Sequence, residues 1–167
     1  MLTPNPLSLS AIAEAIRHQV LTRPVLAISG AGAATVSTTN AIVYTIDGRI
    51  YNKAALSAQS IATIATGAPA EYLQPASTTV YYALCLDSSG NVRFVQGTYA
   101  GQTFLTAGRV DKGLGGVPDI PDGYCPFGLI KVVTNASTTF NIGTTLLDAA
   151  GLTVTFIDIS QLPKTAP

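Results

Sequence analysis

The sequence has few charged side chains, a single histidine and no tryptophan. Nine lysines and arginines balance nine aspartates and glutamates, so the formal net charge is zero. Binding to nucleic acid depends on clustered basic residues, and this sequence contains no such cluster. Because His18 is the only histidine, neither a hydrolytic triad nor a zinc site is expected. We therefore expect no catalytic residue, no metal site, no cofactor and no nucleic-acid partner.

Cysteine is scarce and long apolar runs are missing. Cys85 and Cys125 form no CxxC pair, and buried free thiols are favoured over a disulfide, although pairing stays open. No apolar run approaches the roughly 18 residues of a membrane helix. The N-terminus also lacks the basic and apolar regions of a signal peptide. We expect no membrane contact, and a protein that is made and used in a cytoplasm or in something assembled there.

Apolar residues are abundant for a chain with so few charges. They make up 47% of the sequence and charged residues only 11%, against roughly 25% charged in an ordinary soluble domain. Either a partner covers much of the surface, or Ser, Thr, Asn and Gln cover it. Large exposed apolar areas usually mark interaction sites, so a partner is favoured. Secreted β-proteins share this composition, and that alternative stays open.

One helical pattern is present, near the N-terminus. Apolar residues recur at helical spacing and stop before Pro24, which predicts an amphipathic helix. Its apolar side consists of Leu9, Ile12, Ala13, Ile16 and Val20. We divide the chain into an N-terminal arm and helix over residues 1–24, a β-domain over 25–162 and a C-terminal tail over 163–167.

The β-domain contains short Val, Ile, Thr and Tyr-rich runs separated by turn residues. Asp47-Gly48 predicts a tight turn in a hairpin over residues 41–51, because such turns need positive φ. A second hairpin is expected over residues 78–96, with its loop at 87–91.

Two strands differ in their patterns. Residues 78–86 are almost continuously apolar, which predicts burial on both faces, whereas residues 152–159 alternate. About eight such strands predict a mainly β fold, an antiparallel β-sandwich or jelly-roll with the N-terminal helix attached.

Gly and Pro interrupt the sequence between residues 112 and 123, which predicts a long loop of the kind that often carries recognition. The aspartates mostly occupy turn positions, and Asp111, Asp119 and Asp122 lack the spacing of a calcium loop. We expect the N-terminal helix and this loop to be contact elements. The residues chosen are Leu9, Ile12, Ile16, Val117, Pro118, Ile120 and Pro121.

Several turn-and-strand blocks between residues 40 and 162 resemble virion proteins of tailed bacteriophages. The blocks are residues 44–51, 84–92, 117–121, 127–132 and 143–151. Within that group, a small, neutral, β-rich chain with an extended arm is most similar to head decoration, or cement, proteins. Those proteins typically trimerise and clamp neighbouring capsomers on the outer capsid.

The resemblance implies a non-enzymatic structural protein that binds the outer capsid surface and stabilises the head by bridging neighbouring capsomers. Its partners would be the major capsid protein and further copies of itself in a homotrimer. It would be assembled in the host cytoplasm and reside on the head surface of the virion. The alternative is a tail-fibre, baseplate or host-receptor-binding module, although the repeats and long stalk of a fibre are missing from the sequence.

Overall fold

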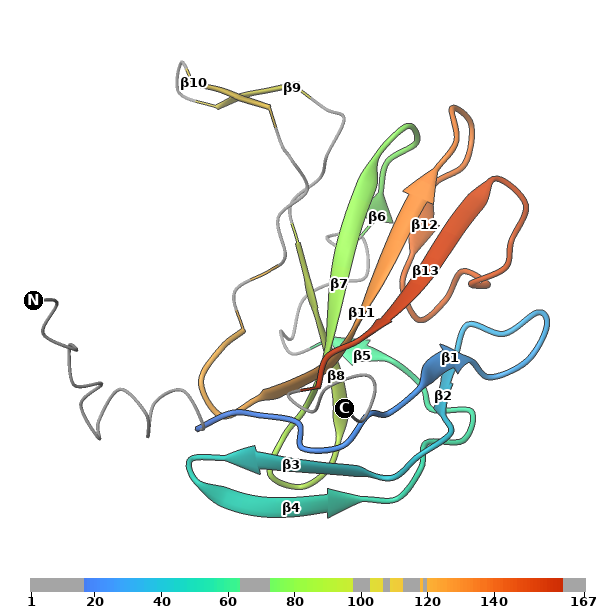
Figure 1. The fold of residues 1–167 in the computed structure, drawn as a ribbon. Helices are drawn as coiled ribbons and strands as arrows, with labels where there is room; N and C mark the ends of the chain where they lie inside the picture. The colour runs from blue at the N-terminus through green and yellow to red at the C-terminus, as the bar shows by residue number, and fades with distance from the viewer. Residues whose placement is uncertain are drawn as a thin grey trace, which may run out of the picture.

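The computed structural model describes residues 17–63, 73–97, 103–106, 109–112, 118 and 120–160. Every regular element within these residues is a β-strand, and all but one of the strand pairs are antiparallel (Figure 1). The prediction of a mainly β, antiparallel fold is confirmed. Its finer description as a sandwich or jelly-roll stays a prediction, because the described strands form one large sheet and several small ones.

The large sheet has five strands. In spatial order they are β13 (Leu152–Asp158), β11 (Cys125–Thr134), β7 (Thr79–Leu86), β8 (Val92–Gln96) and β5 (Ala62–Thr63). Neighbours are antiparallel except for the short β5, which runs parallel to β8. β13 is therefore an edge strand, and β11 and β7 are central.

The remaining strands form two-stranded antiparallel sheets. The pairs are β1 (Leu26–Ile28) with β2 (Val36–Thr38), β3 (Ile42–Ile46) with β4 (Arg49–Lys53), β6 (Leu73–Gln74) with β12 (Phe140–Asn141), and β9 (Thr103–Thr106) with β10 (Arg109–Lys112).

Both predicted hairpins are present. Asp47 and Gly48 have φ of 50° and 75°, the positive values that a tight two-residue turn between β3 and β4 requires. In the β7–β8 loop Gly90 has φ of 76°, and the Asp87 carboxylate accepts hydrogen bonds from the backbone N–H groups of Ser89 and Asn91. The residues of the two turns thus set the pairing register of the β3–β4 and β7–β8 hairpins.

The main hydrophobic core lies on one face of the five-stranded sheet and is closed by the β1–β4 region, which Figure 1 shows below the sheet. Alternate residues of β7 point into it, because side chains along a strand alternate between faces. The largest fully buried side chains of this core are Tyr44, Tyr82, Phe127, Phe140, Ile42, Leu84, Leu86 and Ile130.

The opposite face of the sheet carries a smaller cluster. Ala83, Cys85 and Leu129 are buried there, and Ile120 and Tyr124 pack against them from the segment that precedes β11. β7 is therefore covered on both sides, as its continuous apolar sequence predicts.

A β-bulge changes the phase of β11. Its pairing with β7 shifts between Pro126 and Gly128, so that Phe127 is an extra residue. Cys125 and Phe127 point into the main core before the bulge, and Ile130 does so after it. Proline lacks the N–H of a regular ladder, which is why it is found at such irregular positions within sheets.

A buried polar group closes one end of the core. The Gln74 amide is fully buried and donates to the carbonyls of Thr78 and Val132, while its oxygen accepts from the Tyr82 hydroxyl. Because every described polar atom of this amide has a partner, its burial avoids the cost of an unsatisfied group.

The N-terminal helix is not supported. Residues 1–16, with Leu9, Ile12 and Ile16, lie outside the described part of the chain. The last predicted turn is wrong, since Val20 forms a β-bridge with Tyr44 and the N–H of Leu21 donates to the carbonyl of Val43. Pairing with β3 and burial of Val20 outweigh the helical periodicity here.

Candidate functional site

A hollow of about 380 Å³ opens at the turn between β3 and β4. Its wall brings together parts of the chain that are far apart in sequence. The lining residues are Ile46, Asp47, Arg49, Tyr51, Ser88 and Gly123. Both charge signs and one aromatic ring are present, which is the kind of lining that orients a small polar ligand.

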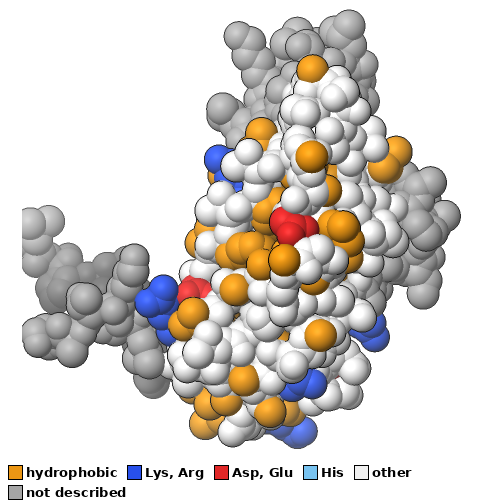
Figure 2. Space-filling view, turned by 90° about the vertical axis from the view of Figure 1, so that its right-hand side faces the viewer, with side chains coloured by type: hydrophobic (Ala, Val, Ile, Leu, Met, Phe, Trp, Pro, Cys, Tyr) orange, Lys and Arg blue, Asp and Glu red, His pale blue; other side chains and the backbone are white. Residues whose placement is uncertain are grey.

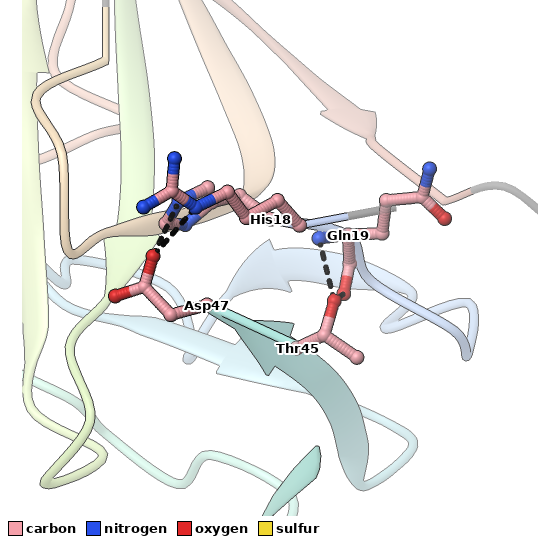
Figure 3. Close-up of polar contacts among 5 residues, drawn as sticks. His18, Gln19, Thr45 and Asp47 are labelled. Atoms are coloured by element: carbon pink, nitrogen blue, oxygen red, sulfur yellow. Dashed lines mark hydrogen bonds and ion pairs between the residues drawn. The ribbon is translucent and has the colours of Figure 1, made fainter. Parts of the chain in front are cut away.

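Asp47 is the charged centre of this region. Its Oδ1 lies 2.8 Å from Nε of Arg17 and 3.5 Å from Nε2 of His18 (Figure 3). The tight turn places the carboxylate outward, where its side chain is 54% exposed. At this exposure the ion pairs are screened by water, so they contribute little to stability.

Residues 17–21 reach this position because they run beside β3. The N–H of Thr45 donates to the carbonyl of Gln19. The N–H of Gln19 donates to the Thr45 hydroxyl, as Figure 3 shows. These bonds place Arg17 and His18 next to the turn that carries Asp47.

Two stacked tyrosines support the hollow. The rings of Tyr44 and Tyr51 are 5.4 Å apart, and the Tyr44 hydroxyl donates to the carbonyl of Asp87. Burial raises the pKa of Tyr44 to about 12, with the Asp87 charge adding to the effect, so its hydroxyl remains a donor at neutral pH. The stack holds the ring of Tyr51 in place at the wall of the hollow.

Asp87 is held as a carboxylate at the neighbouring loop. Burial alone would raise its pKa, but hydrogen bonds from Asn91 and Ser89 and the nearby charge of Arg93 lower the pKa below its usual value. The charge therefore serves to fix the β7–β8 loop, which contributes Ser88 to the hollow.

The hollow presents groups that can bind a small polar ligand. Nδ1 of His18 is buried and has no hydrogen-bond partner in the described part of the chain, and no hydrogen bond joins His18 to Ser88. A serine nucleophile needs a base within hydrogen-bond reach. What the hollow offers is the guanidinium of Arg49, the carboxylate of Asp47 and the ring of Tyr51.

Of the predicted contact residues, the three that the structure describes do not line this hollow. Ile120 is half-buried in the chain's own second cluster, Pro118 is half-buried, and Pro121 is exposed. Val117 lies outside the described residues, as do Leu9, Ile12 and Ile16.

Large exposed apolar side chains occur on separate parts of the molecule. Ile50 on β4 is 70% exposed, Leu73 on β6 46%, Leu146 in the β12–β13 loop 44% and Ile157 on β13 37%. Figure 2 shows hydrophobic side chains around an acidic one on the face that carries the β1–β2 and β12–β13 loops. These loops are joined by a hydrogen bond from the N–H of Leu147 to the carbonyl of Ala33.

The cysteines are buried free thiols, as expected. Cys125 points into the main core and Cys85 into the second cluster, so the two side chains lie on opposite faces of the sheet. Burial raises the pKa of each thiol to about 12, which keeps both in the unreactive protonated form at neutral pH.

Comparisons with protein-family models, with curated proteins and with solved structures found no match. Within the described ranges, no group of three or more His, Cys, Asp or Glu side chains is placed to hold a metal ion. The part of the chain that the structure describes also contains no helix long and apolar enough to cross a membrane.

Sequence reasoning missed the hollow. It assigned Asp47 to a turn and the tyrosines to packing, and both statements hold. The missing information was the proximity of the turn to Ser88 and Gly123, which depends on long-range pairing. One local signal was available, because Arg49 and Tyr51 lie two residues apart in a strand and therefore share a face.

Proposed function

We propose that this chain is a non-enzymatic structural protein of a phage particle that binds the outer capsid surface and bridges neighbouring capsomers. The observation that carries the proposal is the distribution of exposed apolar side chains over separate parts of a protein with few charges. The likeness of its turn-and-strand blocks to virion proteins supplies the class of partner.

A bridging protein needs at least two separate adhesive surfaces. Ile50 lies on the β3–β4 hairpin, Leu73 lies on β6, and Leu146 lies in the loop before β13. Figure 1 shows β4 below the five-stranded sheet and β6 beside the upper part of β7. Contacts made at both places would connect two neighbours rather than attach the chain to one.

Burial of these side chains would supply the adhesion. Each Å² of apolar surface removed from water contributes roughly 25 cal/mol, less the costs of association. The scarcity of charge keeps the desolvation cost low at such contacts. Many copies, each contributing a small amount, would stabilise the shell against the outward pressure of packaged DNA.

The proposal includes the finer features that the resemblance implies. These are a homotrimer bound to the major capsid protein, a place on the head surface, and a sandwich or jelly-roll arrangement of the strands. Assembly would take place in the host cytoplasm.

The test uses heads of the phage that encodes the chain, prepared from a deletion of its gene. We expect the purified protein to bind these heads to saturation and to raise their disruption temperature. Ile50→Lys and Leu146→Lys should weaken binding, whereas Thr139→Lys, at an exposed position in the β11–β12 loop, should not. Failure of the wild-type protein to bind the heads would overturn the proposal.

A second candidate function is supported by the hollow beside Asp47. Its aromatic ring, guanidinium and carboxylate are groups that bind sugars, as a host-receptor-binding module of a tail would require. Under this alternative the protein binds host cells and not heads. Tyr51→Ala and Arg49→Ala would abolish that binding, while Ile50→Lys, between them in sequence but on the other face of β4, would not.

A further inference from the structure

The outer edge of β13 is unpaired along its central residues. Two hydrogen bonds show which backbone groups face outward: the N–H of Ile159 donates to the carbonyl of Phe127, and the N–H of Asn135 donates to the carbonyl of Gly151. They lie at the two ends of an antiparallel ladder in which the odd-numbered residues of β13 form the hydrogen-bonded pairs with β11. The N–H and carbonyl groups of Val154 and Phe156 therefore point away from the sheet.

Both ends of this edge are less open than its centre. The N–H of Leu152 already donates to the carbonyl of Ala149. At the other end, the Asp158 carboxylate accepts from the backbone N–H of Leu26 and pairs with Arg23. Within the described residues, Val154 and Phe156 have no partner for their outward groups.

The core is also incomplete at this edge. Val154 and Phe156 face the main core, but both are only half-buried. Their register partners on β11, Val132 and Ile130, are fully buried. One more strand beside β13 would cover the two half-buried side chains.

β13 lacks the devices that usually protect an edge. Proteins blunt edge strands with lysine, proline, bulges or short length. β13 is seven residues long, has a regular register with β11, and carries no charge before Asp158 at its end. Its exposed face shows Thr153, Thr155 and Ile157, which do not repel a second strand.

We propose that β13 is the site where a second copy of this chain binds, by antiparallel pairing of the two β13 strands about a two-fold axis at Thr155. Thr155 lies midway between the two residues with free outward groups. The axis therefore pairs Val154 of each copy with Phe156 of the other, and every free outward N–H and carbonyl of these residues finds a partner. The inference does not rest on the proposed function. A two-fold pair cannot lie within the homotrimer proposed above, because each chain has one β13, and only a pair of trimers could contain both contacts.

The pairing is compatible with both faces of the sheet. Core-facing Val154 meets core-facing Phe156, and exposed Thr153 meets exposed Ile157, so the two five-stranded sheets join without exchanging faces. The two Asp158 carboxylates lie at opposite ends of the paired strands, so like charges are kept apart. A two-fold contact of this kind is self-complementary, as isologous interfaces must be.

Cysteine cross-linking tests the axis directly. In the proposed register the Thr155 residues form a non-hydrogen-bonded pair with Cα atoms about 4.5 Å apart, close enough for a disulfide. Thr155→Cys should therefore give a covalent dimer on mild oxidation, whatever the total number of copies in the assembly. Thr153→Cys is the matched control, because its copies would lie about 14 Å apart and should not cross-link.

Light scattering over a range of concentrations gives the second test. Val154→Pro removes an outward N–H without removing a bond to β11, and should weaken association at least about tenfold. Thr155→Lys places like charges across the axis and should do the same, whereas Thr139→Lys should not. Circular dichroism and melting checks that each variant is folded.

Two outcomes would overturn the inference. The first is a wild-type protein that remains monomeric at all concentrations while Thr155→Cys cross-links no faster than Thr153→Cys. The second is an oligomer whose mass is unaffected by Thr155→Lys. Because these experiments use the isolated chain, their failure is distinguishable from a failure to bind phage heads.

Discussion

β7 and β13 flank the same strand, β11, and pair with it in the same antiparallel sense. Their surroundings differ. β7 has the buried main core on one face and the Ala83 cluster on the other, so six of its eight residues are buried. In β13 no residue is fully buried, and half-buried residues alternate with exposed ones.

The comparison shows that burial in a strand is set by its place in the sheet more than by its partner. In this sheet β7 is apolar on both faces because a cluster covers each of them, whereas β13 packs on the main core with one face only. Because β13 is at the edge of the sheet, its sequence can be polar on one face, and its outward backbone N–H and carbonyl groups remain available. If the second copy binds as proposed, stability and association depend on different strands.

The largest difference should appear on truncating a leucine in each strand. Leu84→Ala in β7 removes a fully buried side chain and should lower the free energy of unfolding by about 2–5 kcal/mol. Leu152→Ala in β13 removes a half-buried one and should cost less than half as much. Urea titration measures both. Equal losses would show that the edge strand is as tightly packed as the centre.

The buried hydroxyl of β7 gives the next effect. Tyr82→Phe leaves the Oε1 of Gln74 without its donor in a site with no solvent access, and should cost about 1–3 kcal/mol by thermal or urea unfolding. Tyr81→Phe, on the half-exposed face of the same strand, should have little effect. A similar loss for the two variants would show that the hydrogen bond between Tyr82 and Gln74 does not contribute to stability.

Hydrogen bonds join the end of β13 to the start of β1 and to Arg23 in the segment before it. Asp158→Ala removes the acceptor of the Leu26 N–H and the partner of Arg23, and should cost about 1–2 kcal/mol. Asp122→Ala, at an exposed turn position, serves as the control. If the two substitutions have equal effects on the melting temperature, the tie does not stabilise the edge.

The loop after β7 predicts a dependence on pH. The pKa of Asp87 is lowered in the folded protein, so its contribution is present above the unfolded pKa of about 4 and is lost as pH falls through the lower folded value. Asp87→Asn should cost less than about 1 kcal/mol at neutral pH. It should also flatten the fall in melting temperature below pH 4, and an unchanged acid slope would contradict this assignment.

The smallest effect is expected on the exposed face of β13. Thr153→Val changes a side chain with no described hydrogen bond at an exposed position, and should alter the free energy of unfolding by less than about 0.5 kcal/mol. The measurement belongs at low concentration, where a bound second copy does not contribute. A larger change would mean that this face is covered by the chain itself.

Local chemistry in the sequence was enough to predict the two hairpins and the contrast between β7 and β13. Asp47-Gly48 and Gly90 fix their turns through backbone conformations that few other residues adopt. The alternation in residues 152–158 separated the side chains of the two faces, but which face is exposed could be seen only in the structure. These features depend on residues that are close in sequence, and for that reason they could be predicted.

The strand order of the large sheet and the hollow beside Asp47 could not be predicted, because both depend on pairing between residues that are distant in sequence. Nothing in residues 79–86 shows that they pair with 125–134 rather than with another strand. Val20 shows the competition most clearly. Its spacing fits a helix, but its burial against Tyr44 in a β-bridge decides its conformation.

The bulge at Phe127 has a consequence for how this chain can change in length. Because one extra residue brings Cys125 and Phe127 into phase with Ile130, deletion of a single residue there would turn the whole N-terminal part of β11 over. Insertions and deletions in β11 are then acceptable only in compensating pairs. The loops before and after β11 have no such constraint, so length variation among relatives should accumulate there and be missing from residues 125–134.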